Sequence, residues 1–138
     1  MEDNNLIFND EEAQKYAKEA EEKWGNTEAY KQSQEKVKKL GTLGMIRVAR
    51  ELDRLMKDLS KNMDNGPKSQ EVQDLMAKHY ESLRNFYEPS LQMYRGLGNM
   101  YVQDKRFSSF FDKYKPGLAE FMRDAINYYC DKQEGRQI

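Results

Sequence analysis

The sequence has little of what metal-bound, disulfide-linked or membrane-spanning proteins depend on. It contains one cysteine, Cys130, and one histidine, His79, in 138 residues. A single cysteine excludes an internal disulfide, and one cysteine with one histidine cannot supply the four ligands of a structural zinc site. No apolar run is long enough to cross a bilayer, and we find no secretory signal. We therefore expect a protein of the reducing cytoplasm that has no membrane partner and no bound metal.

The sequence also lacks an excess of charge of either sign. Its 23 basic and 24 acidic residues leave a net charge of -1, although charged residues make up 34% of the chain. Without a basic field, direct contact of this chain with nucleic acid is not expected. A length of 138 residues is enough for one hydrophobic core and too short for two. The chain is therefore expected to form one domain.

What the chain does contain is apolar residues at helical spacing. They recur every three or four residues over 46–63 and 72–87, on both sides of a break at Asn65-Gly66-Pro67. Ser69 is placed to cap the second of these helices, which should end at Glu88-Pro89 because proline disfavours the helical conformation of the residue before it. The two helices should pack antiparallel across a short loop.

Three more helices are predicted from the C-terminal third. Ser90 can cap a helix that reaches Tyr101, and Gly96 and Gly98 inside it predict close approach of another helix or of a ligand. An aromatic helix should follow over 107–114, and a last one should start at Pro116. No alternating pattern is long enough for a strand. The predicted fold class is all-α.

The N-terminal segment, residues 1–40, differs from the rest. Two helices are predicted in it from residues at helical spacing: Ala13, Tyr16, Ala17, Ala20 and Trp24 in the first, and Tyr30, Ser33, Val37 and Leu40 in the second. Most of these residues are small, and the surrounding residues are charged or amide. Such faces bury little apolar area to offset the entropy lost on ordering. Gly41 and Gly44 then provide a flexible joint. We expect residues 1–40 to form a mobile lid, 41–134 a stable core and 135–138 a disordered tail.

Catalysis is weakly supported by the residue types. His79 lies on the buried face of its helix, where a structural histidine is the better interpretation, and Cys130 has no basic neighbour that would lower its pKa. The pairs Glu11-Glu12 and Glu21-Glu22 lie among lysines and indicate a solvated helix face. Haem would need His79 as its only histidine ligand. We therefore expect neither an enzyme nor a cofactor.

Binding is better supported, because nine tyrosines, eight methionines and six phenylalanines supply large, adaptable apolar surfaces. Most aromatic residues at helical spacing belong to a core, and Leu83, Phe121 and Ile126 are assigned to it, as is Leu97 on periodicity alone. The core and the binding interpretations both remain open for a set of amphipathic aromatic residues near helix ends and glycines: Trp24, Tyr30, Tyr87, Tyr94, Tyr101 and Phe107.

Several segments in order carry a family resemblance: Trp24-Gly25-Asn26-Thr27-Glu28-Ala29-Tyr30, Phe86-Tyr87-Glu88-Pro89-Ser90, Met93-Tyr94-Arg95-Gly96-Leu97-Gly98 and Tyr114-Lys115-Pro116-Gly117. Over 10–132 the chain resembles the TipAS family, the antibiotic-recognition domain of some MerR-type transcription activators. The resemblance implies a globin-like core and a cleft that binds large, multiply heterocyclic peptide antibiotics such as thiopeptides. The residues it assigns to ligand binding are Trp24, Tyr30, His79, Phe86, Tyr87, Met93, Tyr94, Leu97, Tyr101, Phe107 and Phe111.

Two departures from the family pattern limit what is transferred. Some members carry a cysteine in the loop before the Met-Tyr-Arg-Gly-Leu-Gly helix that can add to the ligand, whereas this loop reads Glu88-Pro89-Ser90. A serine hydroxyl without an activating base is a poor nucleophile, so reversible capture is expected. We also expect no helix-turn-helix region upstream of the domain. We expect a monomer that is either an effector fragment or a stand-alone drug-sequestering protein. The alternative is a helical protein-interaction module without a small-molecule ligand.

Overall fold

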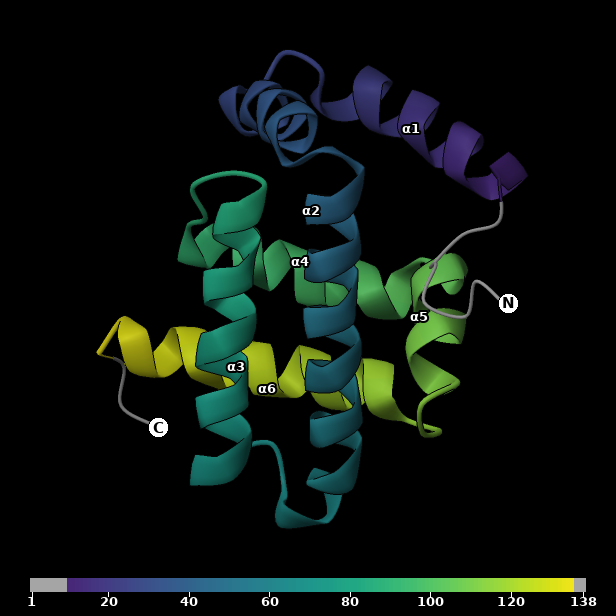
Figure 1. The fold of residues 1–138 in the computed structure, drawn as a ribbon. Coiled ribbons are helices and arrows are strands. Elements are labelled where there is room, and N and C mark those ends of the chain that lie inside the picture. The colour runs from purple at the N-terminus through teal and green to yellow at the C-terminus, as the bar shows by residue number, and fades with distance from the viewer. Residues whose placement is uncertain (1–9, 136–138) are drawn as a thin grey trace.

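The computed structural model describes residues 10–135, and all regular structure within that range is helical (Figure 1). This confirms the predicted all-α class. Residues 1–9 of the N-terminal segment and residues 136–138 of the predicted tail lie outside the described residues. The elements are α1 (Asp10–Trp24), α2 (Glu28–Lys61), η1 (Met63–Asn65), α3 (Gln70–Ser82), η2 (Leu83–Asn85), α4 (Leu91–Gln103), α5 (Lys105–Asp112) and α6 (Leu118–Gln133).

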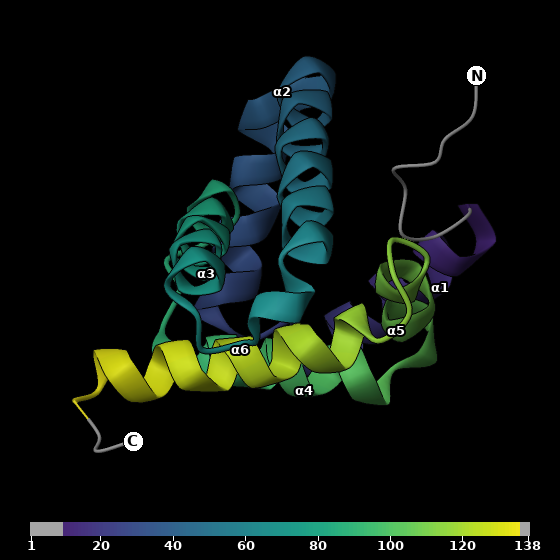
Figure 2. The same ribbon diagram turned by 90° about the horizontal axis from the view of Figure 1, so that it is seen from below.

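Two pairs of helices cross to form the core. The second half of α2 runs antiparallel to α3, as predicted. This pair packs across a second pair formed by α4 and α6 (Figures 1 and 2). The short α5 closes one end of this arrangement against α4 and α6. The largest side chains that are fully buried come from α2, α3, α4 and α6: Leu59, Val48, Val72, Met76, Tyr94, Leu118, Met122, Ile126 and Cys130.

One of the two glycines in α4 is explained by helix packing. A Cβ atom at Gly98 would lie 3.3 Å from Cδ1 of Ile126 and 3.4 Å from Cα of Arg123, so α6 approaches the bare backbone there. This confirms the predicted close approach for Gly98. Gly96 faces solvent with no neighbouring atom within 4 Å of such a Cβ, so helix packing does not explain it.

The predicted caps are correct, but two helix ends are not. Ser69 and Ser90 accept hydrogen bonds from backbone N–H groups three residues on, at 3.3 and 3.2 Å. The helix expected to reach Glu88 ends as an α-helix at Ser82, whose hydroxyl and carbonyl both take part in local hydrogen bonds that compete with the helical ladder. The last helix begins at Leu118 instead of Pro116, because Gly117 precedes it in a left-handed conformation.

The described part of the N-terminal segment is helical and lies against the core. It consists of α1 and the first half of α2, which turns sharply at Gly41 before running down beside α3 (Figure 1). Only Ala20 is buried among the side chains described between residues 11 and 40. In the described range, no helix has both the length and the apolar character that crossing a bilayer requires.

Candidate ligand-binding site at the seam between the N-terminal segment and the core

The seam is the surface along which residues 10–40 meet the core, and Arg106 of α5 is its most connected side chain. Its guanidinium donates to Oε1 of Glu19 in α1 at 2.8 Å and to both carboxylate oxygens of Asp104. It also lies over the ring of Tyr16, 5.3 Å from the centroid. One cation thereby links an ion pair and an aromatic contact across the seam.

The first half of α2 is held by two polar contacts to η2 and the chain that follows it. Oε1 of Gln32 accepts a hydrogen bond of 3.0 Å from the backbone N–H of Glu88. The Lys36 ammonium donates to the carbonyl oxygen of Arg84 at 2.8 Å. Both contacts are exposed, and water can replace each of them at little cost. The first half of α2 is therefore held by polar groups at the surface.

Beneath the seam, a row of aromatic rings runs from α1 into the core. Tyr16 meets Phe107 edge-on at a centroid distance of 5.6 Å. Phe107 and Phe111 in turn flank Tyr101, at 5.7 and 4.7 Å. Burial raises the pKa of Tyr101, whose side chain is closed off from solvent. The N-terminal segment thus covers the open end of an aromatic row that continues through the domain.

His79 is buried between α3 and α4 and serves as a neutral hydrogen-bonding group. Its Nδ1 lies 2.8 Å from the hydroxyl of Tyr94, which also donates to the carbonyl oxygen of Met76. Burial lowers the pKa of His79 to about 4. The ring lies beside Tyr94 and Tyr101, at centroid distances of 5.5 and 6.4 Å. These contacts fit the structural interpretation of His79 and join it to the aromatic row.

The predicted ligand-binding residues fall into two groups by burial. One group is buried in this closed conformation and has its ring faces occupied by neighbours: His79, Tyr94, Tyr101, Phe107 and Phe111. The other group is half-buried at or near the surface: Trp24, Tyr30, Phe86, Tyr87, Met93 and Leu97.

Within the half-buried group, Trp24 and Tyr30 lie on the N-terminal segment and Tyr87 on the core. Trp24 ends α1 and its ring is covered by the Lys23 ammonium at 5.2 Å, while Tyr30 sits in the first turn of α2. Burial is the main cause of the raised pKa of Tyr87, and the nearby Tyr16 adds to it. Tyr87 therefore lies close to Tyr16 at the seam, with part of its surface open to solvent.

Sequence reasoning missed the contacts that hold the seam. Tyr16 is predicted only as part of a weak helix face, although it is the one aromatic side chain in the middle of α1. Arg106 and Glu19 are 87 residues apart, and nothing in the sequence links them. The same holds for Gln32 and the backbone of Glu88. Only an aromatic residue among alanines could have drawn attention to α1.

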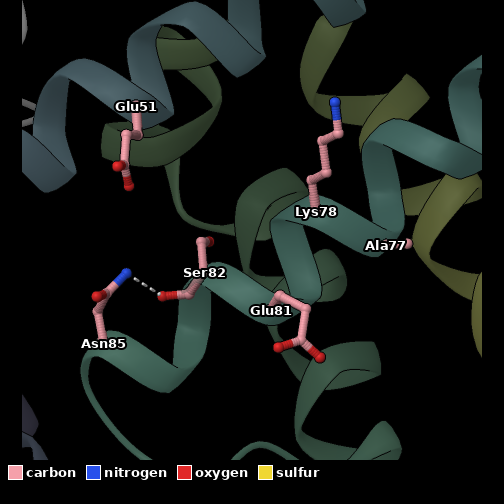
Figure 3. A pocket seen from close by; sticks show the side chains of 6 residues that line it. All are labelled: Glu51, Ala77, Lys78, Glu81, Ser82 and Asn85. Atoms are coloured by element: carbon pink, nitrogen blue, oxygen red, sulfur yellow. Dashed lines mark hydrogen bonds between the residues drawn. The ribbon is translucent and has the colours of Figure 1, made fainter.

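A separate hollow of about 440 Å³ opens between α2 and α3 (Figure 3). None of the predicted ligand-binding residues lines it. Its carboxylates are already engaged, since Glu51 pairs with Arg47 and Glu81 with Arg84. In Figure 3 the Asn85 amide turns back to donate to the Ser82 carbonyl oxygen, at 2.9 Å. Because these polar side chains already bond to other protein groups, they offer few hydrogen bonds that could orient a ligand.

Nucleophilic or metal chemistry has no geometric support at the seam. Within residues 10–135 no three histidine, cysteine or carboxylate side chains gather as metal ligands would. The Ser90 hydroxyl accepts a hydrogen bond from the backbone N–H of Met93 and caps α4, so it is engaged in helix capping. Cys130 is buried, and burial raises the pKa of its thiol to about 11. What the seam can supply is aromatic surface and a few polar contacts.

The fold and the seam together define a helical domain in which two N-terminal helices pack over an aromatic core. The model of the TipAS antibiotic-recognition domain matches residues 16–129, and the chain belongs to that family.

Solved and curated relatives agree with this assignment. TipAS from Streptomyces lividans, solved in complex with nosiheptide, superposes with a TM-score of 0.82 at 36% identity, covering 92% of this chain and 91% of that one. The transcriptional activator TipA of Streptomyces coelicolor is 39% identical over 87% of this chain, and mta of Bacillus subtilis is 31% identical over 97%. The chain spans about half, 49%, of the length of each activator.

Proposed function

We propose that this chain binds bulky hydrophobic peptide antibiotics of the thiopeptide class at the seam, non-covalently and without catalysing a reaction. The observation that carries the proposal is that half-buried aromatic residues from both sides, Trp24 and Tyr30 on one and Phe86 and Tyr87 on the other, belong to a domain of the antibiotic-recognition family. A solved relative in that family holds a thiopeptide.

Ligand access in the proposal requires that the N-terminal segment move. Tyr16 covers Phe107, and Phe107 and Tyr101 are buried as long as it does so. Two exposed polar contacts hold the first half of α2, and the Arg106–Glu19 pair and the Tyr16–Phe107 contact hold α1. A large ligand can outweigh these few contacts by stacking its rings on the aromatic residues. Residues 1–40 act as the lid, and residues 41–134 as the surface that it covers.

Capture is reversible in this proposal because no suitable nucleophile lies at the seam. The loop Glu88-Pro89-Ser90 offers a hydroxyl that caps α4, and the single thiol, Cys130, is buried between α4 and α6. Incubation with a thiopeptide that contains dehydroamino acids should leave the intact mass of the protein unchanged after denaturation. An added mass equal to that of the ligand would contradict non-covalent binding.

The biological setting follows from the relatives, which are helix-turn-helix transcription activators. We propose that the chain serves either as the effector domain of a MerR-type regulator or as a stand-alone protein that sequesters the drug in the cytoplasm. In the first case DNA is bound by a separate domain, since a net charge of -1 gives this chain no overall basic field. The isolated domain is a monomer in this proposal.

Thermal unfolding with and without thiopeptides tests the proposal. A ligand at 100 times its dissociation constant should add about 2.7 kcal/mol to the free energy of unfolding, or roughly 10 °C in Tm. Tyr87→Ala should weaken binding at least about tenfold by calorimetry. Tyr128→Ala, which removes a half-buried tyrosine that faces Lys68 near the α2–α3 loop, is the matched control and should bind like the wild type. No Tm shift with nosiheptide and thiostrepton would overturn the proposal.

A second candidate function is a protein-interaction module, and one observation favours it. Apolar side chains are exposed around the bend of α2: Leu43 by 82%, Ile46 by 42% and Val37 by 37%. A partner helix could cover them. In that case thiopeptides would leave Tm unchanged, whereas Leu43→Ser would abolish binding of the partner.

A further inference from the structure

The second half of α2 carries a row of like charges on its outer face. Five basic residues follow one another at steps of three or four, and all are exposed: Arg47, Arg50, Arg54, Lys57 and Lys61. At about 100° per residue, these side chains lie within an arc of about 80° on the helix surface. The acidic residues of this half-helix, Glu51, Asp53 and Asp58, lie on either side of that arc. We call the five basic residues the basic stripe.

The fold gains nothing from the basic stripe. Buried residues such as Val48 and Leu59 lie on the opposite side of the helix, and no other described element covers the side of α2 turned away from α4 and α6 (Figures 1 and 2). Like charges three or four residues apart destabilise a helix. Where a sequence breaks such a local rule without a gain in packing, the reason is expected to lie in function.

Only part of the basic stripe is neutralised within the protein. Arg47 pairs with Glu51 at 3.4 Å, and Lys57 pairs with Asp53 at 3.0 Å. The other three members form no ion pair with any carboxylate of residues 10–135: Arg50, Arg54 and Lys61. These three exposed cations are therefore available to anionic groups from outside the chain.

The exposed face of α1 shows how an ordinary solvated helix differs from the basic stripe. Its exposed charges are of both signs: Glu11, Glu12, Lys15, Lys18, Glu21, Glu22 and Lys23. Neighbours of opposite sign on a helix surface stabilise each other and leave little net field. The basic stripe has no such mixture, so it presents a directed positive field although the whole chain has a net charge of -1.

A groove between α2 and α3 runs beside the basic stripe. It contains the hollow of about 440 Å³ described above and a second one of about 260 Å³, and Lys78 of α3 lines both. In Figure 3 the Lys78 side chain extends away from the Glu81 carboxylate, and Lys78 too has no ion pair within the described range. The smaller hollow is lined by Arg54 of the basic stripe and by three leucines: Leu52, Leu55 and Leu75.

We propose that the basic stripe and this groove dock an acidic amphipathic helix of a partner protein. From Arg47 to Lys61 the stripe is about 21 Å long, which is the length of about 14 helical residues. Acidic side chains of the partner pair with the cations that have no partner in this chain, and its apolar edge covers the leucines of the groove. Complementary charge of this kind speeds association and selects the partner.

Apolar side chains beside the cations favour a protein over DNA as the partner. Leu43 and Ile46 are exposed on the same face, within one turn before Arg47. Together with the leucines of the groove they give the basic stripe an apolar flank, which a protein helix covers and a phosphate backbone does not. None of the eleven predicted ligand-binding residues belongs to this surface, so docking does not depend on the proposed function.

Three synthetic peptides test the docking surface by fluorescence anisotropy. Each has about 18 residues, since shorter helices are marginal in water, and they share one apolar face while the polar face carries Glu, Gln or Lys. At about 50 mM NaCl the Glu peptide should bind at least about tenfold more tightly than the Gln peptide, and the Lys peptide should not bind. Raising NaCl to about 300 mM should weaken the Glu peptide at least about tenfold, because salt screens exposed charges.

Charge reversal then locates the binding surface. Arg50→Glu/Arg54→Glu/Lys61→Glu should weaken the Glu peptide at least about thirtyfold and allow the Lys peptide to bind. Lys105→Glu/Lys113→Glu/Lys132→Glu is the matched control, because it makes the same change in net charge at exposed lysines elsewhere, and it should weaken the Glu peptide less than about threefold. Circular dichroism and a cooperative thermal transition show that each variant has folded. If the first triple variant does not fold, Arg54→Glu alone should still weaken the Glu peptide at least about threefold.

Three results would overturn the docking surface. One is equal weakening in the two triple variants, because net charge alone then explains the binding. Another is failure of the Glu peptide to bind the wild type at low salt. The third is a DNA duplex of about 20 base pairs that binds more tightly than the Glu peptide and is lost only in the stripe variant, which would make the stripe a phosphate-binding face. No antibiotic is present in these measurements, so failure of nosiheptide to bind would count against the proposed function only.

Discussion

The N-terminal segment and the core are built from the same secondary structure but held by different forces. Between residues 11 and 40 one small side chain, Ala20, is buried, whereas the core closes off large side chains such as Leu59, Met76 and Tyr94 completely. The segment is fixed mainly by polar contacts through Arg106, Gln32 and Lys36. Because buried apolar area dominates stability, helical appearance alone says nothing about how firmly an element is attached.

A helical segment of low stability can therefore cover a core of high stability within one domain. Contacts with water-accessible partners each contribute little, so the segment can leave its place without loosening the core. The aromatic row then becomes reachable from the Tyr16 end. The difference in stability between the N-terminal segment and the core leads to the following predictions.

The same leucine truncation should have very different effects in the two regions. Leu59→Ala removes a fully buried side chain and should lower the free energy of unfolding by about 2–5 kcal/mol. Leu40→Ala, at a half-buried site in the N-terminal segment, should cost less than about 1 kcal/mol. Urea denaturation of both variants gives the comparison. Equal losses would show that the segment is as well packed as the core.

Acid should destabilise the core through His79. Burial lowers the pKa of His79 from 6.5 to about 4, so between these values the unfolded chain binds a proton that the folded protein does not. The free energy of unfolding therefore falls as the pH drops through that window, by up to ~3 kcal/mol. The lowered pKa values of Asp53 and Asp104 act only at lower pH.

The pH effect is measured by urea denaturation at pH 7 and pH 4.5. His79→Gln keeps a hydrogen-bonding side chain near Tyr94 but cannot titrate, so its stability should change much less between the two pH values. An equally steep pH dependence in His79→Gln would show that the acid sensitivity arises elsewhere.

Loss of Arg106 should loosen α1 and spare the rest. Arg106→Gln removes the ion pair to Glu19 and the contact over Tyr16, and should make α1 amides exchange faster by an amount equivalent to about 1 kcal/mol. Amides of α3 and α6 should be unaffected. Arg123→Gln removes an ion pair to the adjacent Asp124, serves as the control and should change neither region. Faster exchange throughout the domain would mean that the two regions unfold together.

The two glycines of α4 should respond oppositely to alanine. Gly96→Ala should stabilise the protein by roughly 0.5–1 kcal/mol, because alanine is the better helix former and the site is open. Gly98→Ala should lose that gain, since its Cβ meets Ile126 at 3.3 Å. Thermal unfolding of both variants is sufficient. An equal gain at Gly98 would show that α4 and α6 separate easily.

Much of the fold was predictable because local chemistry decides it. Ser69 and Ser90 cap helices as serine does elsewhere, and the apolar spacing identifies the α2–α3 hairpin. The helix ends that were wrong depend on competing hydrogen bonds around Ser82 and on the left-handed Gly117, which periodicity does not encode. A break at Gly41 was predicted as well, and Gly41 has the non-helical angles φ 66° and ψ -175° between the two halves of α2.

The site was less predictable than the fold. Aromatic residues of α4 and α5 were selected by type, and burial divides them into those packed in the core and those at its surface. The pairing of Arg106 with Glu19 depends on how distant segments meet. A single sequence does not show which residues far apart in the chain come into contact. Ligand-binding roles of the eleven candidate residues stay predictions until the thiopeptide experiments are done.

Native-state hydrogen exchange of the free and thiopeptide-bound protein tests the central claim most directly, since it measures the opening free energy of each amide. In the free protein, amides of residues 10–40 should exchange through openings far less costly than global unfolding, while those of α3, α4 and α6 should approach the global value. Nosiheptide should slow exchange in residues 10–40 more than in any other part of the domain. Equally slow exchange in both regions of the free protein would contradict a weakly held cover on a stable aromatic core.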